Sequence, residues 1–232
     1  MKTLGVIGGM GPEATSFFYA RVTARTKAKR DQDHINIVIL SHATMPDRTK
    51  AILTGEKEEL LSDLIKDVKM LESLGVENIA VPCNTCHYFL HEVQEQTKIP
   101  IINMIEESVR TVIEDHPGIE KIGIMGTDGT IQAGTYHRIC EKYHVQAVAP
   151  KEENQQLVMS LIYDDIKSGK TGDRSKFDRA YEDLMQQGCE AVILACTELS
   201  VFKEFYQVPL NCLDAMDVLV RESILRSGAE LL

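Results

Sequence analysis

The chain repeats one pattern twice, and this repetition limits the folds that it can form. Residues 121–126, Lys-Ile-Gly-Ile-Met-Gly, resemble residues 4–8, Leu-Gly-Val-Ile-Gly, and each segment precedes a glycine-rich turn and a helical pattern. Each half later holds an apolar segment that ends at a cysteine, Cys83 or Cys196. In each half a proline, Pro100 or Pro209, then leads another apolar segment. These matches predict an internal duplication of about a hundred residues.

Short apolar segments alternate with helical patterns in both halves. In the first half we expect strands over 3–7, 35–40, 78–83 and 99–102, helices over 13–29 and about 60–74, a helix ending near 95, and a loop over 41–50. Such alternation predicts parallel sheets covered by helices on both faces. We therefore expect an α/β fold with two similar Rossmann-like lobes and an active site in the cleft between them, at the strands' carboxyl ends. The first expected lobe comprises residues 1–103 and about 214–232, and the second comprises residues 104–213. A closing helix over about 214–226 belongs to the first lobe.

The overall charge argues against two classes of partner. The 232 residues include 35 acidic and 25 basic side chains, which give a formal net charge of −10. This balance disfavours non-specific binding to nucleic acid or to an anionic membrane. No apolar run approaches the roughly 18 residues of a membrane span, and the amino terminus lacks a signal-peptide pattern. We expect a cytoplasmic protein whose six cysteines stay reduced.

Residues 9–14 fit the dinucleotide motif G-x-G-x-x-A after an expected strand. A dinucleotide site also needs an acidic residue at the end of the second strand to bind the ribose. Here that strand ends at Leu40-Ser41-His42, so we do not expect a nucleotide cofactor. A turn of small residues before a helix can instead bind a carboxylate, because its N–H groups lack partners.

The segment Cys83-Asn84-Thr85-Cys86-His87 matches three known cysteine patterns. It has the C-x-x-C-H spacing of haem attachment, the C-x-x-C spacing of redox proteins and, with His91, half of a zinc pattern. Haem attachment requires export and a structural zinc requires a second cysteine pair, so we expect neither. A thiol–disulfide role stays open, but the duplication pairs Cys83 with Cys196 and leaves Cys86 on a helix face.

Cys83 and Cys196 occupy settings that differ from those of the other cysteines. Each ends an apolar strand and precedes an expected helix start. A helix amino terminus stabilises a thiolate and lowers its pKa, which would make either thiol a base near neutral pH. The cysteines that we expect to be inert small core residues are Cys140, Cys189 and Cys212.

The two cysteine segments, Pro82–Thr85 and Ala195–Glu198, together with the opening Gly8–Thr15, resemble the cofactor-independent aspartate/glutamate racemases, most closely the aspartate racemases. The resemblance covers essentially the whole chain. Two positions differ from glutamate racemases, which have His where this chain has Glu198 and Asp-Ser where it has Gly-Gly-Met. Maleate isomerases, hydantoin racemases and arylmalonate decarboxylases share the broader fold.

The resemblance implies a set of site residues. The catalytic pair would be Cys83 and Cys196, and no metal ligand is implied. The substrate-binding residues would be Met10, Arg48, Asn84, Thr85, Thr127, Thr130, Lys167, Thr197 and Glu198. Ordinary structural roles compete with several of these assignments. Arg48 can be a solvated loop residue, Lys167 a helix-end lysine, and the two threonines of 127–130 turn and cap residues.

The implied activity is interconversion of L- and D-aspartate, with glutamate as a further substrate, by a thiol and a thiolate on opposite faces of Cα. No pyridoxal phosphate, metal or nucleotide would take part. Donors such as Asn84, Thr85 and Thr197 would bind the α-carboxylate, and Arg48 and Lys167 the side-chain carboxylate. Glu198 would receive the substrate ammonium or serve only the first turn of its helix. Relatives of this kind are commonly homodimers.

Other functions compete with aspartate racemisation. One is a glutamate or broader-specificity racemase of the same superfamily. Another is a non-catalytic ligand-binding or thiol-redox protein on the same fold. A role in binding alone needs neither cysteine, whereas a readily formed Cys83–Cys86 disulfide would favour redox chemistry.

Overall fold

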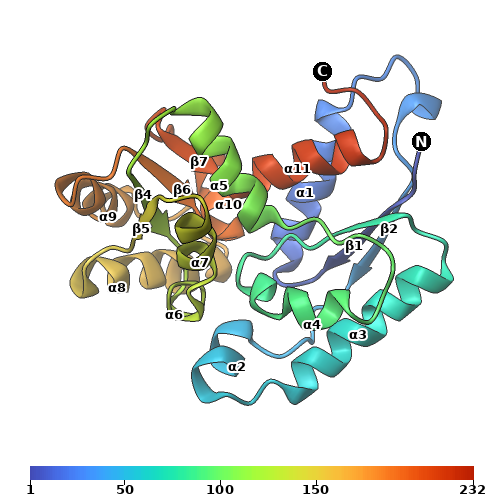
Figure 1. Ribbon diagram of the computed structural model, residues 1–232, viewed down its shortest axis with the longest axis horizontal. Helices are drawn as coiled ribbons and strands as arrows, with labels where there is room; N and C mark the ends of the chain where they lie inside the picture. Colours follow the sequence, from blue (N-terminus) through green and yellow to red (C-terminus); the bar gives the residue numbers. More distant parts are fainter. The chain divides into compact units, whose positions relative to one another are not determined.

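The computed structural model describes residues 1–232, which form two compact units (Figure 1). Unit 1 comprises Met1–Met104 and Met216–Leu232, and unit 2 comprises Ile105–Ala215. Each unit contains one parallel sheet with helices packed around it, which confirms the predicted α/β fold.

Unit 1 has a three-stranded parallel sheet in the order β2-β1-β3. The strands are β1 (Leu4–Gly8), β2 (Ile37–Ser41) and β3 (Asn78–Ala80). The strand expected over 99–102 is reduced to a single parallel bridge between Ile79 and Ile101. Pro100 limits the pairing there because proline has no N–H for a ladder hydrogen bond.

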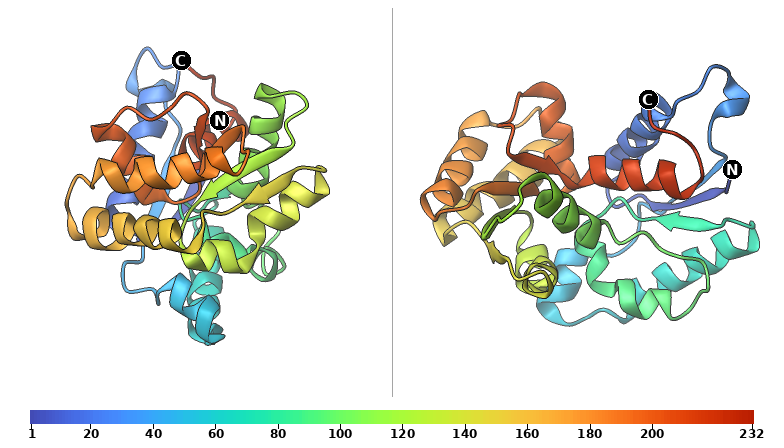
Figure 2. Two further views of the ribbon diagram at one scale, coloured as in Figure 1. Left: turned by 90° about the vertical axis from the view of Figure 1, so that its left-hand side faces the viewer. Right: turned by 45° about the horizontal axis from the view of Figure 1, so that its top comes forward.

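The helices of unit 1 are α1 (Pro12–Arg25), α2 (Arg48–Thr54), α3 (Glu58–Ser73), α4 (Leu90–Gln94) and α11 (Ala215–Arg226). The closing helix α11 lies beside α1 (Figures 1 and 2), where Asp217 accepts from Arg21 at 2.9 Å and pairs with Arg25 at 2.8 Å. The helix expected over 13–29 ends earlier, because Thr26 is extended and bridges to Leu231.

The loop expected over 41–50 is shorter than predicted. Asp47 accepts a hydrogen bond from the Lys50 N–H at 2.7 Å and starts α2 at Arg48. An aspartate at this position stabilises a helix start by about 1 kcal/mol. The cap therefore fixes the backbone that carries Arg48.

Unit 2 has a four-stranded parallel sheet in the order β5-β4-β6-β7. Its strands are β4 (Lys121–Met125), β5 (Gln146–Val148), β6 (Ala191–Leu194) and β7 (Cys212–Asp214). Its helices are α5 (Met104–Asp115), α6 (Asp128–Ala133), α7 (Thr135–Lys142), α8 (Glu152–Ser160), α9 (Arg174–Gln186) and α10 (Thr197–Phe205). A π-helical turn (Leu161–Asp165) and a 3₁₀ turn (Ile166–Ser168) follow α8.

The two sheets share one strand order, as the predicted duplication requires. β2-β1-β3 corresponds to β5-β4-β6, and the bridge at Ile101 takes the place of β7. The packing of the central strands also matches. A Cβ on Gly5 would lie 3.1 Å from Leu71 of α3, and a Cβ on Gly123 would lie 3.0 Å from Leu184 of α9. In both units a glycine of the central strand lets the covering helix approach closely.

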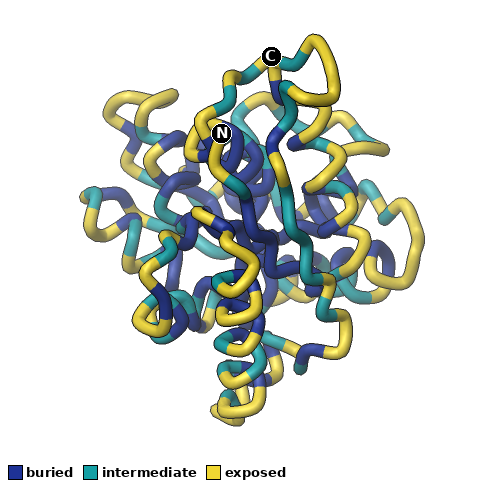
Figure 3. The backbone as a smooth tube through the Cα atoms, turned by 90° about the vertical axis from the view of Figure 1, so that its right-hand side faces the viewer, coloured by how far each residue is buried: buried dark blue, intermediate teal, exposed yellow.

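The core of each unit follows its central strands, which run through the buried sections of the chain (Figure 3). Leu4 and Val6 of β1 and Ile122 and Ile124 of β4 are fully buried. Residues on both sides of these strands are apolar because helices cover both faces. None of the helices is long and apolar enough to cross a membrane.

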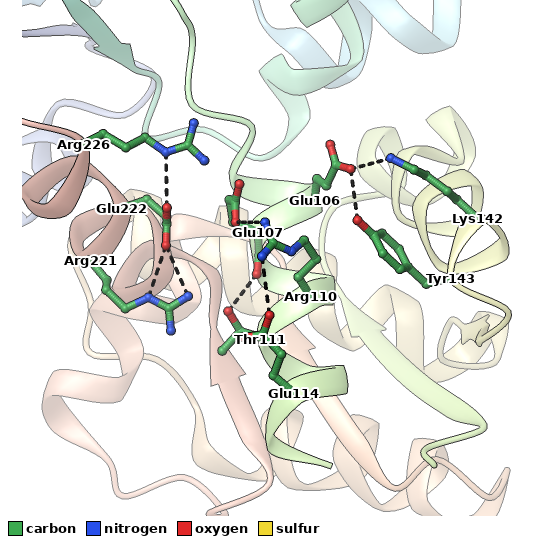
Figure 4. A network of polar contacts seen from close by, with 10 residues as sticks. All are labelled: Glu106, Glu107, Arg110, Thr111, Glu114, Lys142, Tyr143, Arg221, Glu222 and Arg226. Atoms are coloured by element: carbon green, nitrogen blue, oxygen red, sulfur yellow. Dashed lines mark hydrogen bonds and ion pairs between the residues drawn. The ribbon is translucent and has the colours of Figure 1, made fainter. Parts of the chain in front are cut away.

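Polar contacts hold the outer helices of unit 2 (Figure 4). Glu106 of α5 accepts from Lys142 at 2.6 Å and from the Tyr143 hydroxyl at 3.2 Å, at the end of α7. Arg110 pairs with Glu107 at 3.2 Å along the same helix. The cations of these pairs, Lys142 and Arg110, are 60% and 46% exposed, and ion pairs with so exposed a partner contribute little to stability. The buried strands and helices therefore contribute most of the stability.

Two glycines with positive φ provide a matched test of packing at the end of β1. Gly9 has φ +89°, and a Cβ there would lie 2.5 Å from the backbone nitrogen of His42. Gly55 has φ +78° with no atom within 4 Å of its Cβ position. We expect Gly55→Ala to lower the free energy of unfolding by about 1–2 kcal/mol. Gly9→Ala should lower it by about 1–3 kcal/mol more, because backbone atoms cannot yield. Urea denaturation measures both, and equal losses would contradict this packing.

Candidate functional site

Cys83 and Cys196 lie at equivalent places in the two units. Cys83 follows β3 and Cys196 follows β6, the strands that pair with the central strand of each sheet. Both residues are only 6% exposed, so each lies almost entirely out of contact with solvent. Cys196 caps α10, whereas Cys83 precedes a 3₁₀ helix (Thr85–Phe89) and not the expected α-helix.

Arg48 is the cation beside Cys83. Its guanidinium donates to the carbonyls of Pro46 at 3.1 Å and Met10 at 3.4 Å, and it also hydrogen-bonds the Cys83 side chain. Burial opposes its charge, but Cys83, Cys86 and Asp47 together raise the pKa of Arg48. The guanidinium therefore stays protonated next to the Cys83 sulfur and stabilises negative charge there.

Cys86 contacts Cys83, although the sequence analysis assigned it only to a helix face. A side-chain hydrogen bond with Cys83, followed by burial, raises the pKa of Cys86 well above its ordinary value. Its thiol also contacts the Met10 sulfur at 3.6 Å. Cys86 is thus a neutral thiol in the immediate surroundings of Cys83, as the C-x-x-C spacing could have indicated.

His87 fixes the backbone behind Cys83, a role that the sequence analysis missed. Its Nε2 accepts from the N–H of Met104 at 3.2 Å, so the ring proton lies on Nδ1, which donates to the Cys83 carbonyl at 2.9 Å. Burial lowers the pKa of His87, so the ring stays neutral. The position of His87 at the end of the C-x-x-C-H segment is the feature of the sequence that could have predicted this contact.

Cys196 has an anion beside it. Its thiol donates to Oε2 of Glu198 at 2.9 Å, and Lys167 binds Oε1 of the same carboxylate at 2.9 Å. Burial and then the charge of Glu198 raise the pKa of Cys196 well above its ordinary value, while Lys167 acts in the opposite direction. The expected lowering of this thiol pKa at a helix start is therefore wrong. The Glu198 N–H of the helix start does lower it, but burial and the carboxylate have the larger effect.

Lys167 reaches Glu198 from the irregular end of α8. The π-helical turn and the 3₁₀ turn that follow α8 carry Tyr163 and Lys167, and the Lys167 ammonium lies 5.2 Å from the centre of the Tyr163 ring. The ring face favours a cation at this position. The structure thus places Lys167 against a protein carboxylate, next to Cys196.

Thr127 and Thr130 cap a helix close to Cys196. Thr127 Oγ1 accepts from the Thr130 N–H at 3.2 Å and starts α6, and the two hydroxyls are 3.2 Å apart. A Cβ on Gly126 would lie 2.9 Å from the carbonyl oxygen of Ala195. The threonine loop therefore packs directly against the segment that carries Cys196, at one edge of the unit 2 sheet.

The expected site residues thus form two groups, one in each unit. Unit 1 gathers Met10, Arg48, Asn84 and Thr85 near Cys83 through the contacts above and the adjoining chain. Around Cys196, unit 2 gathers Thr127, Thr130, Lys167, Thr197 and Glu198. No cluster of three or more His, Cys, Asp or Glu side chains is arranged to hold a metal ion.

The amino-acid sequence of this chain matches the model of a known protein family. The model of the family described as Asp/Glu/Hydantoin racemase matches residues 7–223. The chain belongs to this racemase family. Family membership supports racemase activity, and both cysteine groups lie within the matched region.

The racemases that this chain resembles are named for different substrates. Over 227 residues the chain is 29% identical to the broad specificity amino-acid racemase RacX of Bacillus subtilis, covering 95% of this chain and 96% of the relative. It is 28% identical to the solved aspartate racemase of Picrophilus torridus, with a TM-score of 0.81 over 100% of this chain and 96% of that one. A glutamate racemase of Persephonella marina is 26% identical over 149 residues, which cover 64% of this chain and 56% of the relative.

Burial has the largest effect on the other three cysteines of this racemase family member. Burial raises the pKa of Cys140 to about 12, that of Cys189 to about 11 and that of Cys212 to about 12. These thiols are protonated at neutral pH, as expected of core residues. Burial is the largest influence on all three of these thiols, whereas Cys196 also donates a hydrogen bond directly to a carboxylate and Cys83 contacts a guanidinium.

His87 gives a pH-dependent test of the structure around Cys83. Its pKa is lower in the folded protein than the value near 6.5 of an unfolded chain, so protonation favours unfolding. Its contribution is complete above about pH 6.5 and falls below it, by up to about 1.4 kcal/mol per pH unit. We expect His87→Asn to lose less stability than the wild type between pH 7.5 and pH 5.0, measured by urea denaturation.

The control is His91→Asn in α4, where the side chain is 84% exposed and lies 3.6 Å from the Glu95 carboxylate. This variant should keep the pH dependence of the wild type. An unchanged pH dependence in His87→Asn would show that the buried imidazole does not control the acid sensitivity.

Proposed function

We propose that this protein interconverts L- and D-aspartate without an added cofactor, with Cys83 and Cys196 as the two acid/base groups. The observation that carries the proposal is the equivalent position of the two thiols, each after the strand beside the central strand of its sheet. Membership of the racemase family agrees with it. Each thiol also has a charged partner that can influence proton transfer.

The chemistry requires two groups. Racemisation removes a proton from one face of Cα and delivers another to the opposite face, so one thiol acts as base while the other acts as acid. The α-proton is only weakly acidic, and donors around the α-carboxylate must stabilise the carbanion. Asn84, Thr85 and Thr197 adjoin the two cysteines and are the donors that we assign to this carboxylate.

Arg48 supports an acidic substrate. Its Nε–H is buried without a protein acceptor, although the other guanidinium nitrogens donate to backbone carbonyls. A buried donor without a partner is costly, and a carboxylate oxygen from a ligand would satisfy it. We therefore assign the side-chain carboxylate of aspartate to Arg48, with Met10, whose carbonyl orients the guanidinium, beside it.

A broader specificity is the second candidate. Lys167, the other expected carboxylate ligand, already binds Glu198 at 2.9 Å. A substrate carboxylate would have to compete for this ammonium, so unit 2 offers a weaker preference for acidic side chains than the sequence suggested. The broad-specificity relative from Bacillus subtilis is consistent with this second candidate. Circular dichroism on a panel of L- and D-amino acids separates the two candidates.

Replacing either catalytic cysteine tests the two-base mechanism. We expect Cys83→Ala and Cys196→Ala each to lower the racemisation rate of aspartate by at least about 10²–10⁴-fold, because each lacks one proton donor or acceptor. Cys212→Ala, which removes a thiol of the unit 2 sheet edge, should keep wild-type activity. Near-wild-type racemisation by either of the first two variants would contradict the mechanism, as would activity that depends on added pyridoxal phosphate.

Deuterium transfer distinguishes two bases from one. In D₂O the wild type should place deuterium in the product during the first turnovers, while recovered substrate stays protiated, because the returning proton comes from the opposite thiol. From the family resemblance we assign L-aspartate to Cys196 and D-aspartate to Cys83. Early and equal labelling of substrate and product would indicate a single base.

Arg48 should set the preference for an acidic side chain. A charge-assisted hydrogen bond contributes about 1.5–3 kcal/mol, so Arg48→Lys, which keeps the charge but loses the planar donor, should raise KM for aspartate about ten- to hundredfold. Its effect on alanine should be much smaller. Lys50→Ala, on the exposed side of the same helix, is the control. Equal changes for aspartate and alanine would remove Arg48 as the carboxylate ligand.

A further inference from the structure

We infer that Cys83 and Cys86 form a site of reversible oxidation, at which hydrogen peroxide joins the two thiols in a disulfide and thereby stops racemisation. The loss of activity rests on the proposed function, in which Cys83 is one of the two acid/base groups. The formation of the disulfide does not depend on that function. The inference gives a role to Cys86, a thiol that the proposed racemisation does not use.

The chain brings the two sulfurs together within one turn. Both side chains are reduced, and they hydrogen-bond each other. Asn84 between them is helical, with φ −58° and ψ −48°, and Thr85 begins the 3₁₀ helix. Residues three apart in a helical turn have Cβ atoms about 5–6 Å apart, whereas a disulfide requires about 3.5–4.5 Å. A small adjustment of this turn is therefore enough to form the bond.

His87 holds the backbone of this turn. Its Nδ1 donates to the Cys83 carbonyl at 2.9 Å, and its backbone N–H donates to the Asn84 carbonyl at 3.0 Å. Neither contact uses the sulfur of Cys83 or Cys86, so oxidation leaves both contacts in place. The turn is thus prepared for the disulfide without unfolding of the surrounding core.

Cys83 is the thiol that reacts with peroxide. Thiolates react with peroxides more readily than thiols, and a neighbouring cation favours the thiolate. The Arg48 guanidinium hydrogen-bonds the Cys83 side chain and stabilises negative charge there. Cys83 is only 6% exposed, but the proposed function requires that an amino acid reach its sulfur, and hydrogen peroxide is smaller than an amino acid.

Cys86 is the thiol that completes the disulfide. Its hydrogen bond with Cys83, then burial and then the charge of Cys83 raise the pKa of Cys86, while Arg48 acts in the opposite direction. Oxidation of Cys83 to a neutral sulfenic acid removes that charge and weakens that hydrogen bond, whereas Arg48 remains. Cys86 thus loses its proton more easily once its partner has been oxidised, and a thiolate is the attacking species in disulfide formation.

The atoms and electrons of the oxidation balance. The Cys83 thiolate attacks one peroxide oxygen, so an S–O bond forms, the O–O bond breaks, and the other oxygen leaves as hydroxide, which takes up the proton that Cys83 had released. The Cys86 sulfur then attacks the Cys83 sulfur, so an S–S bond forms, the S–O bond breaks, and the leaving hydroxide takes the Cys86 proton. Two thiols and one peroxide molecule give one disulfide and two water molecules. Each sulfur loses one electron to the peroxide oxygens.

The disulfide makes the loss of activity reversible. A disulfide sulfur has no proton to exchange with Cα, so racemisation stops, but an added thiol restores both cysteines by exchange. Without Cys86, more peroxide would convert the sulfenic acid of Cys83 to a sulfinic acid, which dithiothreitol does not reduce. Cys86 therefore protects Cys83 from irreversible oxidation.

Cys196 provides a comparison within the same chain. Its thiol donates to the Glu198 carboxylate at 2.9 Å, and burial and the charge of that carboxylate raise the pKa of Cys196. The groups with the largest effect on this thiol are a carboxylate and an ammonium, with no second cysteine among them. We therefore expect peroxide to modify Cys83 before Cys196.

Peptide mapping tests the disulfide directly. Trypsin should release residues 70–98 as one peptide that contains Cys83 and Cys86 and no other cysteine. The wild type is treated with hydrogen peroxide, unfolded, alkylated with iodoacetamide and digested. We expect this peptide to lose two hydrogen atoms and to carry no alkyl group, and dithiothreitol before alkylation to restore two alkylation sites. Alkylation of both cysteines, or oxygen atoms added to either, would overturn the inference.

Activity measurements test the role of Cys86. Complete oxidation of the wild type should lower aspartate racemisation by at least about 10²-fold, as loss of an acid/base group does, and dithiothreitol should restore it. Cys86→Ala and Cys86→Ser, each compared with its own untreated activity, should stay inactive after dithiothreitol, with Cys83 as the sulfinic acid. The control Cys212→Ala should behave as the wild type. Equal recovery of the Cys86 variants and the wild type would overturn the role of Cys86.

The inference and the proposed function fail in different experiments. A wild type that does not racemise aspartate would contradict the proposed function, and the peptide map would still decide whether the disulfide forms. A wild type that racemises aspartate but forms no disulfide between Cys83 and Cys86 would overturn only the oxidation site. Full racemisation with the disulfide in place would contradict both the control of activity and the assignment of Cys83 as a base.

Discussion

The cost of burying charge shapes both halves of this protein. Each cysteine at a strand end is almost inaccessible to water, where an isolated thiolate is unfavourable. In unit 1 the Arg48 guanidinium, which backbone carbonyls hold next to Cys83, offsets this cost. In unit 2 the Glu198 carboxylate and the Lys167 ammonium form a pair without net charge next to Cys196. One duplicated fold therefore supplies two opposite electrostatic environments.

The parallel sheets make these environments equivalent in position. The order β2-β1-β3 in unit 1 and β5-β4-β6 in unit 2 brings the end of a central strand beside the end of the strand that carries the cysteine. The turn after β1 contributes Met10, and the turn after β4 contributes Thr127. Close approach at Gly126 and Ala195 shows how little space separates such turns. Side chains far apart in sequence are in this way collected at one sheet edge.

The sequence was sufficient for the fold and for the positions of the two cysteines, because strand and helix periods and the duplication are local signals. It was not sufficient for the pairing of charges. The helix start that follows Cys196 favoured a lowered thiol pKa, but the pKa depends on burial and on a carboxylate that only the folded helix directs toward the sulfur. The contacts of Cys86 and His87 likewise depend on the 3₁₀ geometry after Cys83, where an α-helix was expected. Similarly, Pro100 reduced a strand to a bridge.

The π-helical turn at Leu161–Asp165 has an evolutionary consequence. A π turn contains one residue more than an α-helical turn, and it changes the direction of every side chain that follows. Lys167 lies just beyond it and reaches Glu198 from there. Deletion of a single codon in this turn would restore a regular helix and rotate Lys167 by about 100°. Loss or gain of one residue in this turn is therefore a single evolutionary step that would remove the Lys167 ammonium from Glu198 or restore it, with Glu198 still beside the second cysteine.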